Sequence, residues 1–222
     1  MGFGYRQSDE TVEWMILTIG HLSVNTFWGE SERRRGPLCT STLLWTPAGL
    51  AIIDPSLQPE HMAALLNDQA GVRPEDIGTV LLTHFHGGHR FGLEAFPQAT
   101  WLMAEAEIAD WRPRVGAADA ALLDRILPAG DTPLPGCRLL PTPGHTAGHH
   151  SLLFPWRGRR VAVAADAAMT EDFFRARQGY HNSTNIEQAR ASIDLLGREA
   201  DVIIPGHGNV FVPAWAPGEV NE

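Results

Sequence analysis

Five apolar runs of this chain each lead into a histidine or an aspartate. "AII" leads to Asp54, "VLLT" to His84, "LLPTPG" to His145, "VAVAA" to Asp166 and "VIIPG" to His207. Short apolar runs that are bounded by turn residues predict buried strands. The fold must therefore accommodate several strands that each end in a histidine or an aspartate, which are residues that can bind a metal.

Nine short runs predict strands, and two longer segments predict helices. The strand ranges are 14–19, 41–46, 50–53, 79–83, 100–104, 137–140, 150–154, 160–165 and 201–204. "PEHMAALLNDQAG" predicts a helix that begins at Pro59 and stops at Gly71, with Met62, Leu65 and Leu66 on its buried side.

"STNIEQARASIDLLGREA" predicts a second helix, which Ser183 or Thr184 would cap. Its apolar stripe would hold Ile186, Ala189, Ile193 and Leu196. The stretch 112–135, rich in Ala, Asp and Pro, is expected to be an irregular or helical insertion. Many strands with helices outside them predict an α/β fold of packed sheets covered by helices. With 222 residues, 44% of them hydrophobic, we expect one domain over 1–222.

Charge and cysteine content narrow the functional classes. Asp and Glu outnumber Lys and Arg by 26 to 17, so the average surface would repel a nucleic acid. The only cysteines are Cys39 and Cys137, which fits a reducing compartment and offers no cysteine-rich metal site. "MGFGYRQSDE" lacks a basic region followed by an apolar stretch, and no apolar run reaches the ~18 residues of a membrane span. We expect a cytoplasmic protein without nucleic-acid or membrane partners, and a homodimer stays open.

"LLTHFHGGH" places His84, His86 and His89 within six positions, directly after an apolar run. Histidines at i and i+2 on a loop that leaves a strand can both turn toward one ion, and imidazole suits zinc, iron or nickel. Taken alone, the cluster fits a surface loop or buried structural histidines about as well as a metal site.

The other strand ends favour the metal site. His145 follows a Pro-Gly turn that fixes the backbone, and glycines on both sides of His207 let the chain approach an ion closely. Asp166 follows an unbroken apolar strand, which is a poor place for a charge unless a cation compensates it. Together these positions predict a shared cation.

The order of these motifs resembles the metallo-β-lactamase superfamily, whose series is an early Asp, then H-x-H-x-D-H, then His, Asp and His on successive strand ends. The resemblance runs from "GHLSVNTFW" to "PGHGNVF". It implies an αββα sandwich of two mixed β-sheets flanked by helices, with the metals at one edge between the sheets. It also implies a site in which His84, His86 and His145 hold a first metal, His89 and His207 hold a second, Asp166 bridges both, and Asp54 orients a ligand histidine.

Gly88 departs from the family pattern, because most members carry there an Asp that binds the second metal. The second site then keeps at most His89, His207 and Asp166, so we expect one zinc ion, or one tight and one loose. Other groups that could fill the gap are extra water, His149, His150 or His181.

The resemblance implies a metal-dependent hydrolase that acts on a small molecule. Zinc held by neutral imidazoles lowers the pKa of its bound water from ~15.7 toward ~7, which supplies hydroxide to attack an ester, lactone or thioester. Asp166, His89 and His207 would be the catalytic residues that orient the nucleophile and relay its proton. The stretch 71–107 is also similar to the same region of N-acyl-homoserine lactonases.

Two other functions stay open. A mononuclear Fe²⁺ enzyme similar to persulfide dioxygenases would use His84 or its neighbour, His145 and Asp166. A binding or regulatory protein could have kept the fold and lost activity.

Two segments are candidates for substrate contact. Arg33, Arg34 and Arg35 could attract an anionic group, although we favour a solvated hairpin tip for this loop. Residues 180–182 could donate a proton or contact an oxyanion, although helix capping explains Asn182 equally well.

Overall fold

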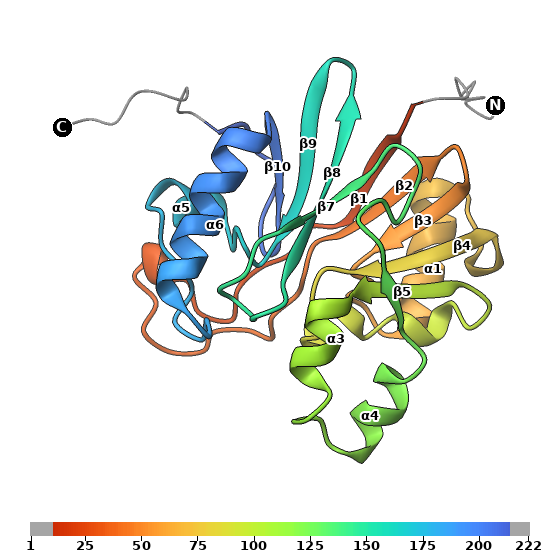
Figure 1. Cartoon of the computed structure of the whole chain (residues 1–222), viewed down its shortest axis with the longest axis horizontal. Coiled ribbons are helices and arrows are strands. Elements are labelled where there is room, and N and C mark those ends of the chain that lie inside the picture. The colour runs from red at the N-terminus through yellow and green to blue at the C-terminus, as the bar shows by residue number, and fades with distance from the viewer. Residues whose placement is uncertain (1–10, 214–222) are drawn as a thin grey trace.

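Two mixed β-sheets lie face to face in the computed structural model, which describes residues 11–213 (Figure 1). The first sheet has the order β1 (Glu13–Thr18), β2 (Ser41–Thr46), β3 (Gly49–Ile53), β4 (Ile77–Leu82), β5 (Thr100–Ala104) and β6 (Leu127–Ala129). The second has the order β10 (Val202–Pro205), β9 (Arg159–Ala165), β8 (His150–Trp156) and β7 (Arg138–Pro141). Strands β3 to β6 are parallel, as are β9 and β10, and the other neighbouring pairs are antiparallel.

Helices cover the outer faces of both sheets (Figure 1). Helix α1 (Pro59–Ala70) lies on the first sheet, and α5 (Glu171–Arg175) and α6 (Ile186–Glu199) lie on the side of the second. The remaining helices are α2 (Gly87–Arg90), α3 (Glu105–Trp111), α4 (Ala117–Leu123) and the short 3₁₀ turns η1 (Thr26–Trp28), η2 (Pro74–Asp76) and η3 (Leu93–Ala95). The predicted αββα sandwich is therefore confirmed.

Side-chain alternation along the strands builds the layers. Successive strand residues point to opposite faces, so Ile52 of β3 packs toward α1, whereas Ile53 packs between the sheets. In the second sheet Phe154 faces the first sheet, and Leu153 faces α6. Each sheet is therefore apolar on both faces, which explains why its strands read as continuous apolar runs rather than as alternating ones.

The predicted elements agree with the structure, with three corrections. Helix α4 agrees with the predicted irregular or helical insertion 112–135, but strand β6 also lies there, and its three residues are too few to give a pattern. Asn185 caps α6, rather than Ser183, Thr184 or Asn182, because its side chain accepts a hydrogen bond from the Gln188 N–H. Ile186 is exposed and does not belong to the buried stripe.

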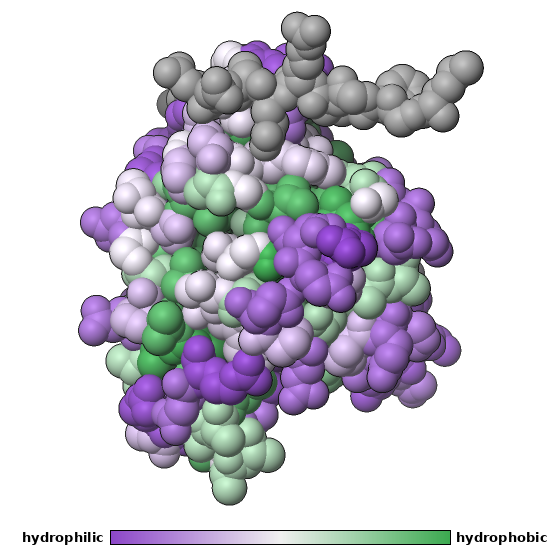
Figure 2. Space-filling model, turned by 90° about the vertical axis from the view of Figure 1, so that its right-hand side faces the viewer, coloured by the Kyte–Doolittle hydropathy of each residue, from purple (hydrophilic) through white to green (hydrophobic). Residues whose placement is uncertain are grey.

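The surface of the described residues is mixed in hydropathy. On the face drawn in Figure 2, hydrophobic residues form separate areas among hydrophilic ones. Within residues 11–213, no helix combines the length and apolar character that a bilayer crossing requires. The N-terminal stretch "MGFGYRQSDE", on which the expectation of a cytoplasmic protein partly rested, lies outside the described residues.

Candidate metal centre

The motif-bearing strand ends meet at one edge of the sandwich. Parallel strands β3 and β4 end there and lead into Asp54 and His84, and β9 and β10 lead into Asp166 and His207. Strand β8 runs antiparallel to β9, so the loop before it, which carries His145, lies at the same edge. The topology therefore brings together groups that are up to 153 positions apart in the chain, as from Asp54 to His207.

Three histidines surround one oxygen of Asp166. His145 Nε2 lies 3.1 Å and His84 Nε2 lies 3.7 Å from Asp166 Oδ2. His86 Nδ1 lies 2.9 Å from His145 Nε2 and 3.1 Å from His84 Nε2. One ligand atom from each of these four residues lies within 4.8 Å of all the others, which is a spacing that one metal ion could bridge.

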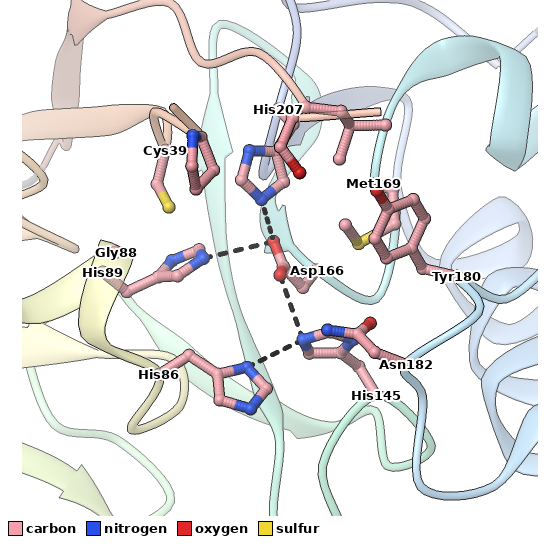
Figure 3. Close-up of a pocket in the computed structure, with 13 residues that line it drawn as sticks. Cys39, His86, Gly88, His89, His145, Asp166, Met169, Tyr180, Asn182 and His207 are labelled. Atoms are coloured by element: carbon pink, nitrogen blue, oxygen red, sulfur yellow. Dashed lines mark hydrogen bonds and ion pairs between the residues drawn. The ribbon is translucent and has the colours of Figure 1, made fainter. Parts of the chain in front are cut away.

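The other oxygen of Asp166 faces a second cluster. His89 Nε2 lies 3.2 Å and His207 Nε2 lies 3.3 Å from Asp166 Oδ1. Cys39 completes this cluster, because ligand atoms of Cys39, His89 and His207 all lie within 4.8 Å of one another. Figure 3 shows the Cys39 sulfur directed toward His89. Asp166 thus turns one oxygen to each set of imidazoles.

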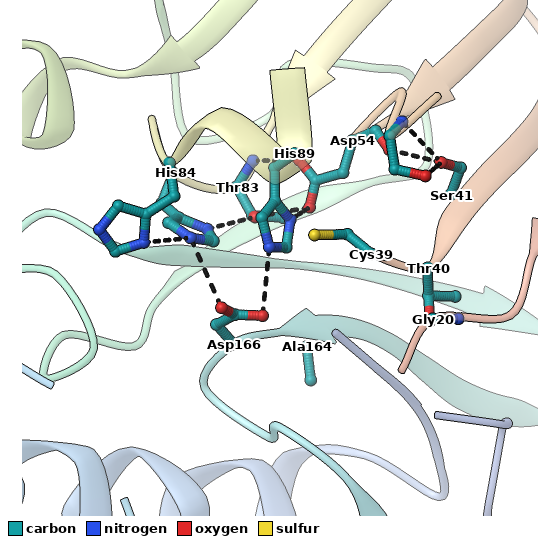
Figure 4. Close-up of polar contacts among 12 residues, drawn as sticks. Gly20, Cys39, Thr40, Ser41, Asp54, Thr83, His84, His89, Ala164 and Asp166 are labelled. Atoms are coloured by element: carbon teal, nitrogen blue, oxygen red, sulfur yellow. Dashed lines mark hydrogen bonds and ion pairs between the residues drawn. The ribbon is translucent and has the colours of Figure 1, made fainter. Parts of the chain in front are cut away.

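Asp54 and Thr83 contact the imidazoles of His84 and His89 on their Nδ1 side, away from Asp166 (Figure 4). Asp54 Oδ2 accepts hydrogen bonds from His89 Nδ1, at 2.9 Å, and from Thr83 Oγ1, at 2.7 Å. Because the Thr83 hydroxyl donates to Asp54, it can accept from His84 Nδ1, which lies 3.1 Å away. Both rings are thereby fixed with Nδ1 protonated and Nε2 directed into the site, which is the tautomer that a metal ligand requires.

Burial sets the charge states of the cluster. It lowers the pKa of His84 well below its usual value and that of His86 to about 4, so both rings are neutral at pH 7. Burial alone would raise the pKa of Asp166, but the imidazoles of His89 and His207 hold it well below its usual range. Burial also lowers the pKa of His89, but Coulombic interactions with Cys39, Asp166 and Asp54 raise it well above its usual value.

Buried atoms directed into the site show that the donor set fits a cation. Apart from the ion pairs that join Asp166 Oδ1 to His89 Nε2 and His207 Nε2, neither His89 Nε2 nor Asp166 Oδ1 has a hydrogen-bond partner within the described residues, and both are buried. Buried charges are normally paired or bind a metal. Imidazole, carboxylate and thiolate are together the ligand types of zinc sites, so these residues fit a divalent metal.

A pocket opens onto both clusters. Five residues of the two clusters line it, namely His86, His89, His145, Asp166 and His207, and Cys39 of the second cluster lines it too. The other lining residues are Leu22, Ser23, Pro37, Gly88, Met169, Tyr180 and Asn182. The Tyr180 hydroxyl donates to the Val24 carbonyl at 2.9 Å, so the ring forms part of the wall. The Tyr180 ring and the Met169 side chain lie on the same side of the pocket and give it an apolar side beside the imidazoles (Figure 3).

Other candidates from the sequence lie elsewhere. His149 is buried and bonds Thr142, His150 bonds the Gly148 carbonyl, and His181 is exposed, so none of them belongs to either cluster.

The three arginines of the loop 27–37 do not line the pocket. Arg35 forms an ion pair with Glu30 and donates to the Leu22 carbonyl. Of residues 180–182, Tyr180 and Asn182 line the pocket.

Sequence reasoning missed Cys39, Thr83 and Glu107. The prediction considered only residues that follow a strand, and Cys39 precedes one. The antiparallel hairpin of β2 and β3 could have indicated Cys39, because the start of β2 lies at the same edge of the sheet as the end of β3. Buried Glu107 accepts hydrogen bonds from Phe85 N and from Thr146 Oγ1, and it thereby joins the two histidine loops.

Comparisons with known proteins find a family and a fold. A family model described as the metallo-β-lactamase superfamily matches residues 34–207. An N-acyl homoserine lactonase of Bacillus cereus is 27% identical over 69% of this chain and 64% of the lactonase. Metallo-β-lactamase domain-containing protein 1 of Xenopus laevis is 33% identical over 64% of this chain and 58% of that protein. The chain thus spans about three fifths of the length of these curated relatives.

A solved structure shares the fold. AidC, a dizinc quorum-quenching lactonase in complex with a product, superposes with a TM-score of 0.68 at 17% identity. The match covers 81% of this chain and 77% of AidC.

Proposed function

Because the chain belongs to the metallo-β-lactamase superfamily, we propose that it is a metal-dependent hydrolase of small lactones, esters or thioesters, with N-acyl homoserine lactones as the first substrates to test. The observation that carries the proposal is Asp166, whose two oxygens face two separate sets of imidazoles. His84, His86 and His145 would hold one zinc ion, and His89 and His207 a second, with Asp166 between them.

Zinc bound there would lower the pKa of a water ligand toward ~7 and polarise the substrate carbonyl. Asp166 would orient the attacking water by hydrogen bond and relay its proton, since its carboxylate is ionised and lines the pocket. His89 and His207 would fix the orientation of that carboxylate. The apolar wall at Leu22 and Met169 would exclude bulk water and receive an acyl group.

We further propose that residues 1–222 work as one metallo-β-lactamase-like domain in the cytoplasm. Both sheets contribute to one site, which supports a single functional unit. The small pocket supports a small-molecule substrate, and the net charge of −9 disfavours a nucleic acid. A homodimer and the lack of membrane partners stay predictions.

The test is zinc-dependent lactone hydrolysis. Metal is removed with a chelator, zinc is added back in steps, and ring opening of short- and long-chain N-acyl homoserine lactones is followed by chromatography. We expect activity to return with zinc and to be lost in His84→Ala, whereas His207→Ala mainly weakens the second ion. His61→Ala, on the exposed side of α1, is the matched control. Zinc binding without hydrolysis of any lactone, ester or thioester would contradict the proposal.

Metal analysis separates this function from the mononuclear-iron alternative. Protein purified without added metal should contain zinc and show no thiol-dependent oxygen uptake. Iron at one atom per chain, together with oxygen uptake in the presence of a persulfide, would favour the dioxygenase.

A further inference from the structure

The space beside Gly88 is already filled by a side chain from another strand. A Cβ atom added to Gly88 would lie 2.8 Å from Cys39 Sγ, which is closer than real Cβ contacts. The sulfur therefore occupies the position toward which a residue 88 side chain would extend (Figure 3). Gly88 itself lines the pocket beside His89.

The backbone around Cys39 is fixed to the loop that carries His207. The Leu38 carbonyl accepts a hydrogen bond from His207 Nδ1 at 2.8 Å, and Thr40 N donates to the Gly206 carbonyl at 2.7 Å. The Cys39 carbonyl itself accepts a hydrogen bond from Thr18 Oγ1 at 2.8 Å. Contacts on both sides of Cys39 thus hold its side chain at the second cluster, so its position is built into the fold.

We propose that Cys39 is a ligand of the second metal and takes the place of the carboxylate that Gly88 lacks. The second site then has four donors, namely Cys39 Sγ, His89 Nε2, His207 Nε2 and Asp166 Oδ1. This inference rests on the proposed function, because it assumes that the Asp166 centre binds metal.

Two observations besides the cysteine point to a ligand at this place. His89 Nε2 and Asp166 Oδ1 are buried, and within residues 11–213 their only partners are each other, at 3.2 Å, and His207 Nε2, at 3.3 Å from the oxygen. Because His89 Nδ1 and His207 Nδ1 both have oxygen acceptors, both Nε2 atoms are available to a cation. One sulfur, two nitrogens and one oxygen would supply the four ligands that zinc takes in structural sites, and the thiol proton would leave to solvent on binding.

The fourth donor changes the expected occupancy. With three ligands only, namely His89, His207 and Asp166, the second site would bind its ion more weakly than the first, as the sequence analysis expected. A thiolate ligand would bring the affinity of the second site closer to that of the first.

The coordination of the wild-type enzyme gives the first readout. X-ray absorption at the zinc edge, on protein with two zinc ions per chain, should show sulfur at ~2.3 Å besides the nitrogen and oxygen shell at ~2.0–2.1 Å. The cobalt-substituted protein should show a thiolate-to-metal charge-transfer band when the second equivalent binds. Cys39→Ala should lose both signals, whereas Cys137→Ala, whose buried cysteine belongs to the core between the sheets, should keep them.

Metal affinity gives a second readout. Cys39→Ala should weaken the second zinc by more than the 10–100-fold that is typical of losing an outer-shell partner, and the first zinc should remain. The double variant Cys39→Ala/Gly88→Asp frees the space that the sulfur occupies and supplies a carboxylate, so it should regain the second zinc without the charge-transfer band.

Sulfur-free coordination of two zinc ions in the wild type would overturn the inference, and so would a charge-transfer band that survives in Cys39→Ala. Either result leaves the hydrolase proposal intact if lactone hydrolysis persists. Failure of the wild type to bind any metal, or to hydrolyse any substrate tested, would instead overturn the proposed function.

Discussion

Asp54 controls two metal-facing rings through one carboxylate. Its Oδ2 accepts from His89 Nδ1 and from Thr83 Oγ1, and the Thr83 hydroxyl in turn contacts His84. Its Oδ1 accepts from Thr83 N at 2.9 Å. A buried carboxylate with three donors is thus used to orient ligands rather than to contact substrate, because it does not line the pocket.

Asp54→Asn should therefore weaken zinc binding without removing a ligand. The amide keeps the shape but offers one acceptor oxygen instead of two, so His89 or Thr83 loses its partner. We expect about a 10–100-fold loss of affinity, larger at the second site, in competition titrations with a chromophoric chelator. Asp76→Asn, in a surface ion pair with Arg73, is the control and should leave both affinities unchanged. Unaltered zinc binding in Asp54→Asn would refute this role.

His86 makes the stability of the metal-free protein depend on pH. Burial lowers its pKa from 6.5 to about 4, so between these values the unfolded chain binds a proton that the folded chain does not. The free energy of unfolding contributed by His86 is therefore complete above pH 6.5 and falls as the pH drops toward 4. His86→Gln should flatten this dependence in urea titrations of the chelated protein, and exposed His61→Gln should not. Equal slopes in all three proteins would exclude the effect.

Helix α3 carries the carboxylate that joins the loops of the first cluster. Glu107 Oε1 accepts from Phe85 N and from Trp111 Nε1, and Oε2 accepts from Thr146 Oγ1. Burial raises the pKa of Glu107, and these hydrogen bonds oppose that rise. The turn between His84 and His86 and the loop around His145 are thus held by one side chain at the helix start.

Glu107→Ala should destabilise the metal-free protein by about 2–5 kcal/mol, because it leaves buried donors without partners. Glu107→Gln keeps an acceptor for Phe85 N and Trp111 Nε1 and should cost less. Urea unfolding of the three proteins measures the difference. A cost below ~1 kcal/mol for the alanine variant would show that water or other groups replace these bonds.

The start of helix α6 offers a separate stability test. Asn185 Oδ1 accepts from Gln188 N at 3.0 Å, so Asn185→Ala should cost about 1 kcal/mol. Ser183→Ala should cost less, since Ser183 Oγ makes no hydrogen bond within residues 11–213. Thermal unfolding compares the two variants, and the reverse order would contradict the assigned cap.

Much of the architecture could be predicted because the evidence is local. Apolar runs and turn residues gave β2 and β5 with correct bounds, and Pro59 and Gly71 gave α1. The candidate site was predicted as far as its groups follow strand ends. Cys39 and Glu107 were missed because their roles depend on which strands and loops become neighbours. The hairpin of β2 and β3 indicates the neighbours of Cys39, but no local pattern indicates those of Glu107. The α6 cap was misplaced because Ser183, Thr184 and Asn185 all suit a cap, and only the backbone path selects one.

The arrangement of two ions around Asp166 is tested most directly by anomalous X-ray diffraction at the zinc edge, on crystals grown with zinc. The account predicts two peaks on opposite sides of the carboxylate, one against His84, His86 and His145, and the other against Cys39, His89 and His207. A single peak, or peaks that do not contact Asp166, would contradict it.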